Sequence, residues 1–165
     1  MNDGTLKLTT PTEREIVMTR VFNAPRKLVF DAMTKPELLK RWFAGPPGWS
    51  LTVCDIDLKV GGGYRYVWRG PDGTNMGMRG KFLEIVPPER VVQTEAFDES
   101  WYPGEAEGTL VLVEENGKTT LTLTVRYESK EARDVALKSP MEEGVTAGYN
   151  KLAEMLASML IEDSE

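Results

Sequence analysis

The sequence predicts an α+β domain in which a curved antiparallel sheet of seven strands wraps around one long C-terminal helix. Three patterns predict this fold class. Residues 49–127 contain strand-like runs separated by turn-forming pairs such as Asn116-Gly117. Two short helical segments come before that region, next to Pro25 and Pro36. Residues 141–160 repeat apolar side chains at spacings of three and four, which indicates one long amphipathic helix.

The N-terminal part is predicted to be one strand followed by two short helices. Residues 14–22 mix apolar side chains with Thr and Arg in a strand-like way, and Pro25 then suits the start of a helix. The apolar residues within 28–33 recur at helical spacing. A second helix begins near Pro36 and carries Trp42.

The central region predicts six further strands joined by tight reversals. They cover residues 49–57, 63–69, 76–86, 90–97, 107–113 and 119–127. In the last of these, apolar residues alternate with Thr and Arg, which is typical of a sheet with one dry face. The C-terminal helix is the natural cover for that face. We therefore expect one domain over residues 12–161, with 1–11 as a loose leader and 162–165 as an acidic tail.

Composition excludes several classes of function. The 165 residues include no histidine, which excludes Ser-His and Cys-His nucleophile pairs and His-ligated metal sites. The single cysteine, Cys54, can form neither an internal disulfide nor a thiolate cluster, and this fits a reducing compartment. A net charge of −6 disfavours nucleic acid as a partner. No apolar run is long enough for membrane insertion, so we expect a cytoplasmic protein without a metal or cofactor.

Two candidate groups follow from strand parity. Tyr64, Tyr66 and Trp68 lie on one face of their strand, either lining a ligand cavity or filling a core. Glu84 shares its parity with Phe82, so it is a candidate inward-facing polar group with a raised pKa. A bulge or the strand end would instead turn Glu84 outward as a solvated or Arg-paired carboxylate.

Two tryptophans, Trp49 and Trp101, lie beside Pro- and Gly-rich loops. Aromatic side chains on loops can form a lid or a partner contact, or they can pack under their own loops. Both alternatives stay open at this point.

Four segments together resemble a known family: FNAPRKLVFDAMTKPELLKRW at 22–42, GGGYRYVW at 61–68, GKFLEIVPPERVV at 80–92 and GYNKLAEML at 148–156. They resemble bacterial single-domain proteins related to the C-terminal domain of the activator of the ninety-kilodalton heat-shock protein ATPase. That family belongs to the START-like (SRPBCC, birch-pollen-allergen-like) superfamily. One departure is Tyr149, where the family often has Trp. The resemblance implies a helix-grip fold with a cavity between sheet and long helix, and it implies no shared catalytic residue.

Three functions are compatible with this resemblance. The first is non-enzymatic binding of an apolar, lipid- or polyketide-like small molecule. Its expected cavity lining is Val29, Tyr66, Trp68, Phe82, Leu123, Val145, Tyr149 and Leu152. The second is a stress-related, co-chaperone-like interaction with a heat-shock ATPase. The third is a cyclase- or hydrolase-like enzyme that uses Glu84 or a tyrosine for proton transfer; no catalytic residue is assigned beyond that alternative.

Overall fold

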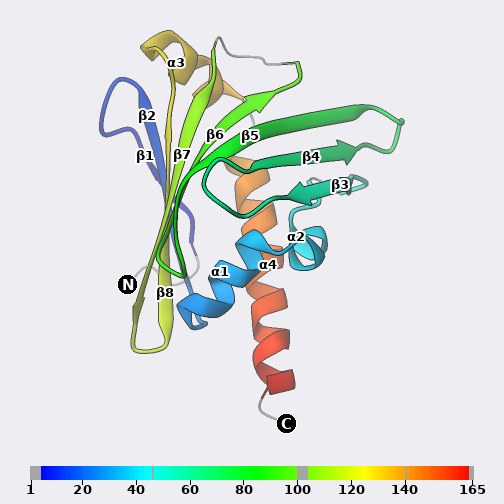
Figure 1. Cartoon of the computed structure of the whole chain (residues 1–165), viewed down its shortest axis with the longest axis vertical. Helices are drawn as coiled ribbons and strands as arrows, with labels where there is room; N and C mark the ends of the chain where they lie inside the picture. The colour runs from blue at the N-terminus through cyan, green and yellow to red at the C-terminus, as the bar shows by residue number, and fades with distance from the viewer. Residues whose placement is uncertain (1–4, 46, 100–103, 140, 164–165) are drawn as a thin grey trace.

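The chain folds as an α+β helix grip, which confirms the predicted fold class (Figure 1). The computed structural model describes residues 5–45, 47–99, 104–139 and 141–163. Over these residues one antiparallel sheet has the strand order β1-β2-β8-β7-β6-β5-β4-β3. The strands are β1 (Lys7–Thr9), β2 (Glu15–Phe22), β3 (Ser50–Ile56), β4 (Gly63–Arg69), β5 (Asn75–Val86), β6 (Arg90–Phe97), β7 (Ala106–Glu115) and β8 (Lys118–Arg126). The helices are α1 (Arg26–Thr34), α2 (Pro36–Trp42), α3 (Lys130–Lys138) and α4 (Met141–Asp163).

The described sheet has eight strands, one more than predicted. The additional strand, β1, lies in the segment expected to be a loose leader, and it pairs Leu8 with Met18 of β2. It was missed because it has three residues and Leu8 is its only half-buried side chain. Such a short segment shows no alternation that sequence could reveal.

Helix α3 was also missed. Its inward side chains are small, since Ala132 and Ala136 are its buried residues. The Ser129 hydroxyl caps the helix by accepting a hydrogen bond from the backbone N–H of Ala132. Two alanines carry little of the apolar signal from which an amphipathic helix is recognised.

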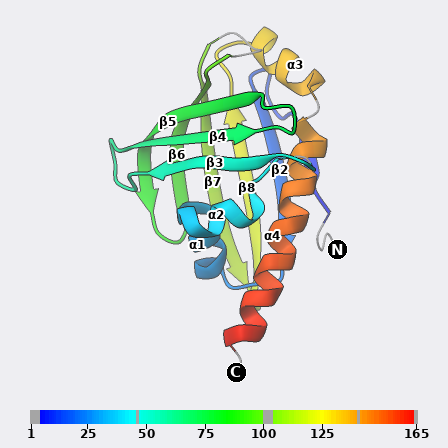
Figure 2. The ribbon, with the colours of Figure 1, turned by 90° about the vertical axis from the view of Figure 1, so that its right-hand side faces the viewer.

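Helices α1 and α2 form the lower part of the grip, next to α4 (Figure 2). Pro25 precedes α1, and Pro36 is the first residue of α2, where its missing N–H costs nothing. The indole N–H of Trp42 donates to the backbone oxygen of Ala32 at 2.9 Å, which locks the two helices together. The Trp42 ring then contacts Tyr149 of α4, with ring centroids 6.0 Å apart. This contact packs α2 against the buried face of α4.

The β7–β8 turn is the one that Asn116-Gly117 predicts. Both residues have positive φ, 55° for Asn116 and 77° for Gly117, as a type I′ turn requires. This turn sets the register that places Leu110 opposite Leu123 and Leu112 opposite Leu121. All four side chains therefore face the same side of the sheet, toward α4.

The core beneath the sheet divides into two clusters. The larger one joins α1, α2 and the second half of α4 to the sheet, and its centre includes Val29, Trp42 and Leu152. The smaller one lies under α3 and includes Ile16 and Val125. Phe97, Leu123, Val145 and Leu6 pack against both clusters and are only partly buried. The centre of the concave face is therefore less tightly covered than either side of it.

None of the described helices combines the length and apolar content needed to cross a membrane.

Candidate functional site

The eight predicted lining residues separate into two groups. Six of them are buried in the larger cluster: Val29, Tyr66, Trp68, Phe82, Tyr149 and Leu152. Leu123 on β8 and Val145 on α4 are only partly buried and lie where the two clusters meet. Most of the expected lining thus packs as core, and the two exceptions mark a different place on the sheet.

We call this place the interior junction, made of Gln93, Glu95, Phe97, Leu123 and Val145. All five are half-buried. On β6, Gln93 pairs with Phe82 and Phe97 pairs with Met78, so Glu95 between them shares their inward parity. Opposite Glu95 on β7 is Ala106, also buried. The junction therefore places one carboxyl group on the concave face, opposite α4.

Glu95 was not a predicted site residue. Its carboxyl group lies over Gly108 of β7, because a Cβ built on that glycine would be 3.2 Å from Glu95 Oε2. The small residue leaves the room that the carboxyl group occupies. Burial raises the pKa of Glu95 to about 7 from its ordinary value of 4.5. Among the described residues, no hydrogen bond or ion pair engages this carboxyl group.

Two tyrosine side chains lie within electrostatic reach of Glu95. Burial raises the pKa of Tyr66 on β4, and the charges of Cys54 and Glu95 raise it further. Burial also raises the pKa of Tyr149 on α4; Glu95 adds to this shift and Arg20 opposes it. Both hydroxyls therefore stay protonated and can donate hydrogen bonds. No hydrogen bond of the described part of the chain uses either hydroxyl.

Arg20 on β2 approaches Tyr149 from the other side. It is 4% exposed, and its Nη1 donates to Oδ1 of Asn150 at 2.7 Å. Its guanidinium carbon lies 5.2 Å from the centre of the Phe22 ring. Its Nε is buried and has no hydrogen-bond partner among the described residues. Burial lowers the pKa of Arg20, against the influence of Tyr149.

An aromatic wall continues from the junction along β4. Tyr64, Tyr66 and Trp68 share one face, as their parity predicts, and the ring centroids of Tyr64 and Tyr66 are 5.0 Å apart. Phe43 meets Tyr66 and Trp68 edge to face, at 5.5 Å and 5.1 Å. The indole N–H of Trp68 donates to the backbone oxygen of Phe43 at 2.8 Å. This wall is well packed and holds its rings in fixed orientations.

Glu84 does not enter the interior, so its assignment as an inward polar group is wrong. The β5–β6 register shifts between Phe82 and Glu84, and Glu84 pairs with Val92, which has the outward parity of β6. Its Oε1 accepts from Nε of Arg90 at 3.1 Å, and 48% of its side chain is exposed. The bulge therefore turns Glu84 outward, where it is paired with an arginine, as the second alternative from the sequence predicted.

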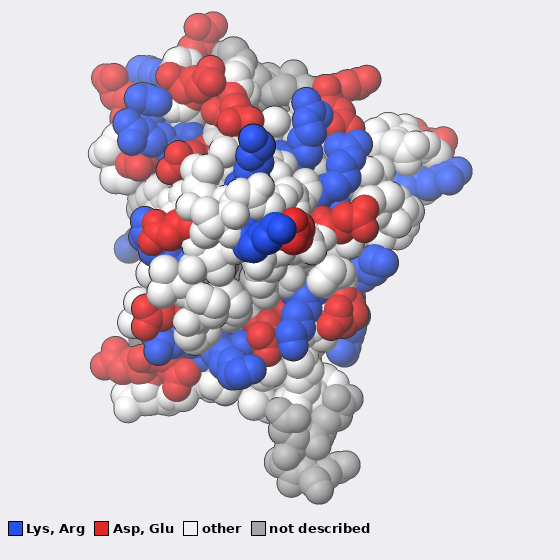
Figure 3. Space-filling view, viewed as in Figure 1, with Lys and Arg blue, Asp and Glu red and all other residues white. Residues whose placement is uncertain are grey.

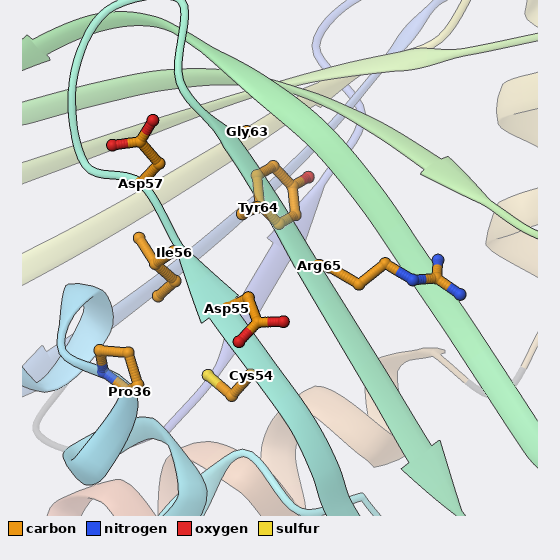
Figure 4. Close-up of a pocket in the computed structure, with 8 residues that line it drawn as sticks. All are labelled: Pro36, Cys54, Asp55, Ile56, Asp57, Gly63, Tyr64 and Arg65. Atoms are coloured by element: carbon orange, nitrogen blue, oxygen red, sulfur yellow. The ribbon is translucent and has the colours of Figure 1, made fainter.

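Two surface hollows do not include the junction. One is lined by Pro36, Cys54, Asp55, Ile56, Asp57, Gly63, Tyr64 and Arg65, along the sheet edge formed by β3 (Figure 4). The other lies on α4 and is lined by Glu142, Glu143, Thr146, Ala147 and Asn150. In the first hollow Cys54 is buried, and burial raises the pKa of its thiol. A buried thiol with a raised pKa is a poor nucleophile at neutral pH.

Trp49 packs against its own surroundings. A Cβ built on Gly70 would be 2.9 Å from the Trp49 ring, so the indole lies directly on the β4–β5 turn. Trp101, the second candidate for a lid, lies outside the described residues.

Charge is mixed over the face seen in Figure 3, where Lys and Arg side chains alternate with Asp and Glu. Charges of opposite sign also pair on the surface: Asp98 accepts from Arg65 and Arg79 at 2.6 Å each. Within the described residues, no three Cys, Asp or Glu side chains are grouped to hold a metal ion.

Comparison with known proteins identifies the family. The sequence profile of the activator of Hsp90 ATPase homolog 1-like proteins matches residues 23–157. A crystal structure of a protein from Rhodobacter sphaeroides is 33% identical with a TM-score of 0.88, over 93% of this chain and 98% of that chain. An NMR structure of a protein from Staphylococcus epidermidis is 29% identical with a TM-score of 0.78, over 91% and 93%. A crystal structure from Nitrosomonas europaea is 26% identical with a TM-score of 0.80, over 92% and 99%. No curated protein sequence matches.

The profile match covers all of the helix grip from α1 to the second half of α4. The likeness to the Rhodobacter sphaeroides structure extends over nearly the whole length of both chains. The chain therefore belongs to the family of activator of Hsp90 ATPase homolog 1-like proteins.

Proposed function

We propose that this protein binds a small, largely apolar molecule at the interior junction, between the concave face of the sheet and α4. One observation carries the proposal: the core is divided, and the inward side chains between its two clusters are only half-buried. The middle of a closed sheet-and-helix sandwich is normally its most buried part. Side chains left half-buried there are available to contact a ligand.

The surroundings favour an apolar, aromatic-compatible occupant. Leu123, Val145 and Phe97 provide apolar surface, and the Tyr66 and Tyr149 side chains lie within electrostatic reach of Glu95. Removing apolar ligand surface from water contributes about 25 cal/mol per Å² before the costs of association. Micromolar affinity for a ligand of two fused rings is therefore a reasonable expectation.

A fluorescent probe and two tryptophan variants test the proposal. N-phenyl-1-naphthylamine is neutral, and its emission rises in apolar surroundings. Leu123→Trp fills the junction, whereas Val113→Trp adds the same ring at a position that is 55% exposed on the same sheet. We expect saturable probe binding to the wild type and to Val113→Trp, and binding weaker by about tenfold or more in Leu123→Trp. Thermal melting of both variants checks that each is folded.

Absence of saturable binding to the wild type would contradict the proposal. Equal affinity of the two tryptophan variants would contradict it as well, since the dye would then bind elsewhere on the protein.

A second candidate is a co-chaperone-like interaction with a heat-shock ATPase. The family description names an activator of the Hsp90 ATPase, and three apolar side chains are exposed at one corner: Leu58 at 40%, Val60 at 65% and Leu83 at 46%. The loop between β3 and β4 lies beside β5 there, because the Gly61 N–H donates a hydrogen bond to the Phe82 backbone oxygen. A saturable rise in chaperone ATP turnover that is lost in Val60→Ser supports this candidate. Unchanged turnover at excess protein contradicts it.

A further inference from the structure

The Glu95 carboxyl group is the feature of the interior that the fold itself does not explain. This carboxyl group is half-buried, and a carboxyl group that loses part of its hydration without gaining a hydrogen bond or an ion pair destabilises a protein. Gly108 of β7 provides the room for this group, and Ala106 of β7 stands opposite Glu95, so β7 supplies no side-chain donor. An apolar side chain at this position would serve packing better. A ligand that hydrogen-bonds to the Glu95 carboxyl group would explain why a carboxyl group stands at this position.

We propose that Glu95 is the polar anchor of this ligand site and selects ligands that carry a neutral hydroxyl group over ligands that carry a carboxylate. The inference rests on the proposed function and names the polar chemistry of the same site.

The groups around Glu95 favour a hydroxyl. A hydroxyl donates one hydrogen bond, which the Glu95 carboxyl oxygen can accept, and it accepts from the tyrosine hydroxyls. Tyr66 from β4 and Tyr149 from α4 both lie within electrostatic reach of Glu95. A ligand ammonium group has donors and no acceptor, so it would leave the tyrosine donors unpaired.

The same surroundings disfavour a carboxylate. Two carboxylates in a water-poor interior repel each other, and one of them must take up a proton before both can be buried. Among the described residues, no Lys or Arg lies within ion-pair distance of Glu95 to offset this repulsion. Arg20 of β2 faces Tyr149, and its Nη1 donates to Asn150, while its Nε has no partner among the described residues. Cys54 of β3 faces Tyr66 and adds no positive charge.

Three ligands with one ring system provide the test. The probes are 2-naphthol, 2-methoxynaphthalene and 2-naphthoate, each measured at pH 7.5 by displacement of N-phenyl-1-naphthylamine. The proteins are the wild type, Glu95→Leu, Glu95→Gln and the control Glu84→Gln, whose carboxylate is exposed and paired with Arg90. Circular dichroism and melting temperature report whether each variant is folded.

In the wild type and in Glu84→Gln we expect 2-naphthol to bind about tenfold more tightly than 2-methoxynaphthalene, the factor that one buried hydrogen bond supplies. We expect 2-naphthoate to bind more weakly still. Glu95→Leu abolishes the preference for naphthol over the methyl ether. Glu95→Gln keeps an acceptor and removes the charge, so it raises the affinity for 2-naphthoate about tenfold or more. This second variant preserves the test if Glu95→Leu does not fold.

Two kinds of result overturn the inference. If the wild type binds none of the naphthalenes, the proposed function fails, and the inference fails with it. If they bind but the naphthol preference survives Glu95→Leu, or 2-naphthoate binds the wild type as tightly as Glu95→Gln, the inference alone fails and the apolar site stands.

Discussion

Replacing Glu95 with Gln should stabilise the protein at alkaline pH and leave its stability almost unchanged at acid pH. Gln has the shape of a protonated Glu and carries no charge. Burial raises the pKa of Glu95 from 4.5 to about 7, so the folded protein holds a proton that the unfolded chain has released. Between these two values the folded state binds more protons than the unfolded state. The free energy of unfolding of the wild type must therefore fall as pH rises through this window, and level off above it.

The magnitude follows from the size of the shift. One pKa unit corresponds to about 1.4 kcal/mol, so a rise from 4.5 to about 7 corresponds to about 3 kcal/mol. The Gln variant should be about equal to the wild type at pH 4 and more stable by up to about 3 kcal/mol at pH 8. For a chain of this length, that difference raises the melting temperature by roughly 6–12 °C.

Urea unfolding of both proteins at closely spaced pH values from 4 to 9 measures the difference directly. Taking the difference cancels the carboxylates common to both proteins, including Asp98 and Asp134, whose pKa values are lowered by hydrogen bonds from Arg65 and Lys130. Glu84→Gln is the matched control, because it makes the same substitution at a carboxyl group whose side chain is 48% exposed. A constant difference between wild type and Glu95→Gln across this range would refute the reasoning, since Glu95 would then be as hydrated in the folded state as in the unfolded chain.

Local geometry predicts the effects of three further substitutions and the reactivity of Cys54. Gly117→Val should destabilise the protein by about 1 kcal/mol or more in urea unfolding, because a β-branched residue is strained at a φ of 77°. Gly80→Ala should cost at least about 2 kcal/mol by the same measurement, since its Cβ would collide with the Thr94 backbone oxygen. Gly144→Ala on α4 should stabilise by about 0.5–1 kcal/mol, because a Cβ there meets nothing within 4 Å and alanine favours helix; an unchanged urea midpoint would argue against helix at this residue. Cys54 should react with Ellman's reagent at least tenfold more slowly in the folded protein than in urea, since burial raises the pKa of its thiol.

Alternation and turn chemistry predicted the sheet because each signal is local. Strands β4 and β6 begin and end at the predicted residues, and Asn116-Gly117 forms its turn. Each of these features depends on neighbours within a few positions along the chain. The short edge strand β1 and the alanine-faced α3 carried weaker signals, because β1 has only three residues and the buried side chains of α3 are alanines.

The inward polar residue could not be predicted from β5 alone, because its position depends on how β5 pairs with β6. Parity along β5 placed Glu84 beside Phe82 on the inward face, but the bulge between them turned Glu84 outward. The same parity argument applied to β6 would have succeeded. Val91 and Phe97 face inward there without an interruption, so Gln93 and Glu95 between them are inward polar side chains flanked by apolar ones. That series was the available signal for the site.

Large aromatic side chains identify the wall of such a site better than the space within it. Tyr66 and Trp68 face inward as predicted, yet their own volume fills the part of the interior that they occupy. Where the inward positions are small, at Ala106 and Gly108 of β7, a neighbouring side chain can lie over the strand, and the Glu95 carboxyl group lies over the glycine. Packing density near that of a crystal requires any such room to be occupied by side chains, water or a ligand. A binding site in a helix grip is therefore better sought at the small residues of the inward face than at the aromatic ones.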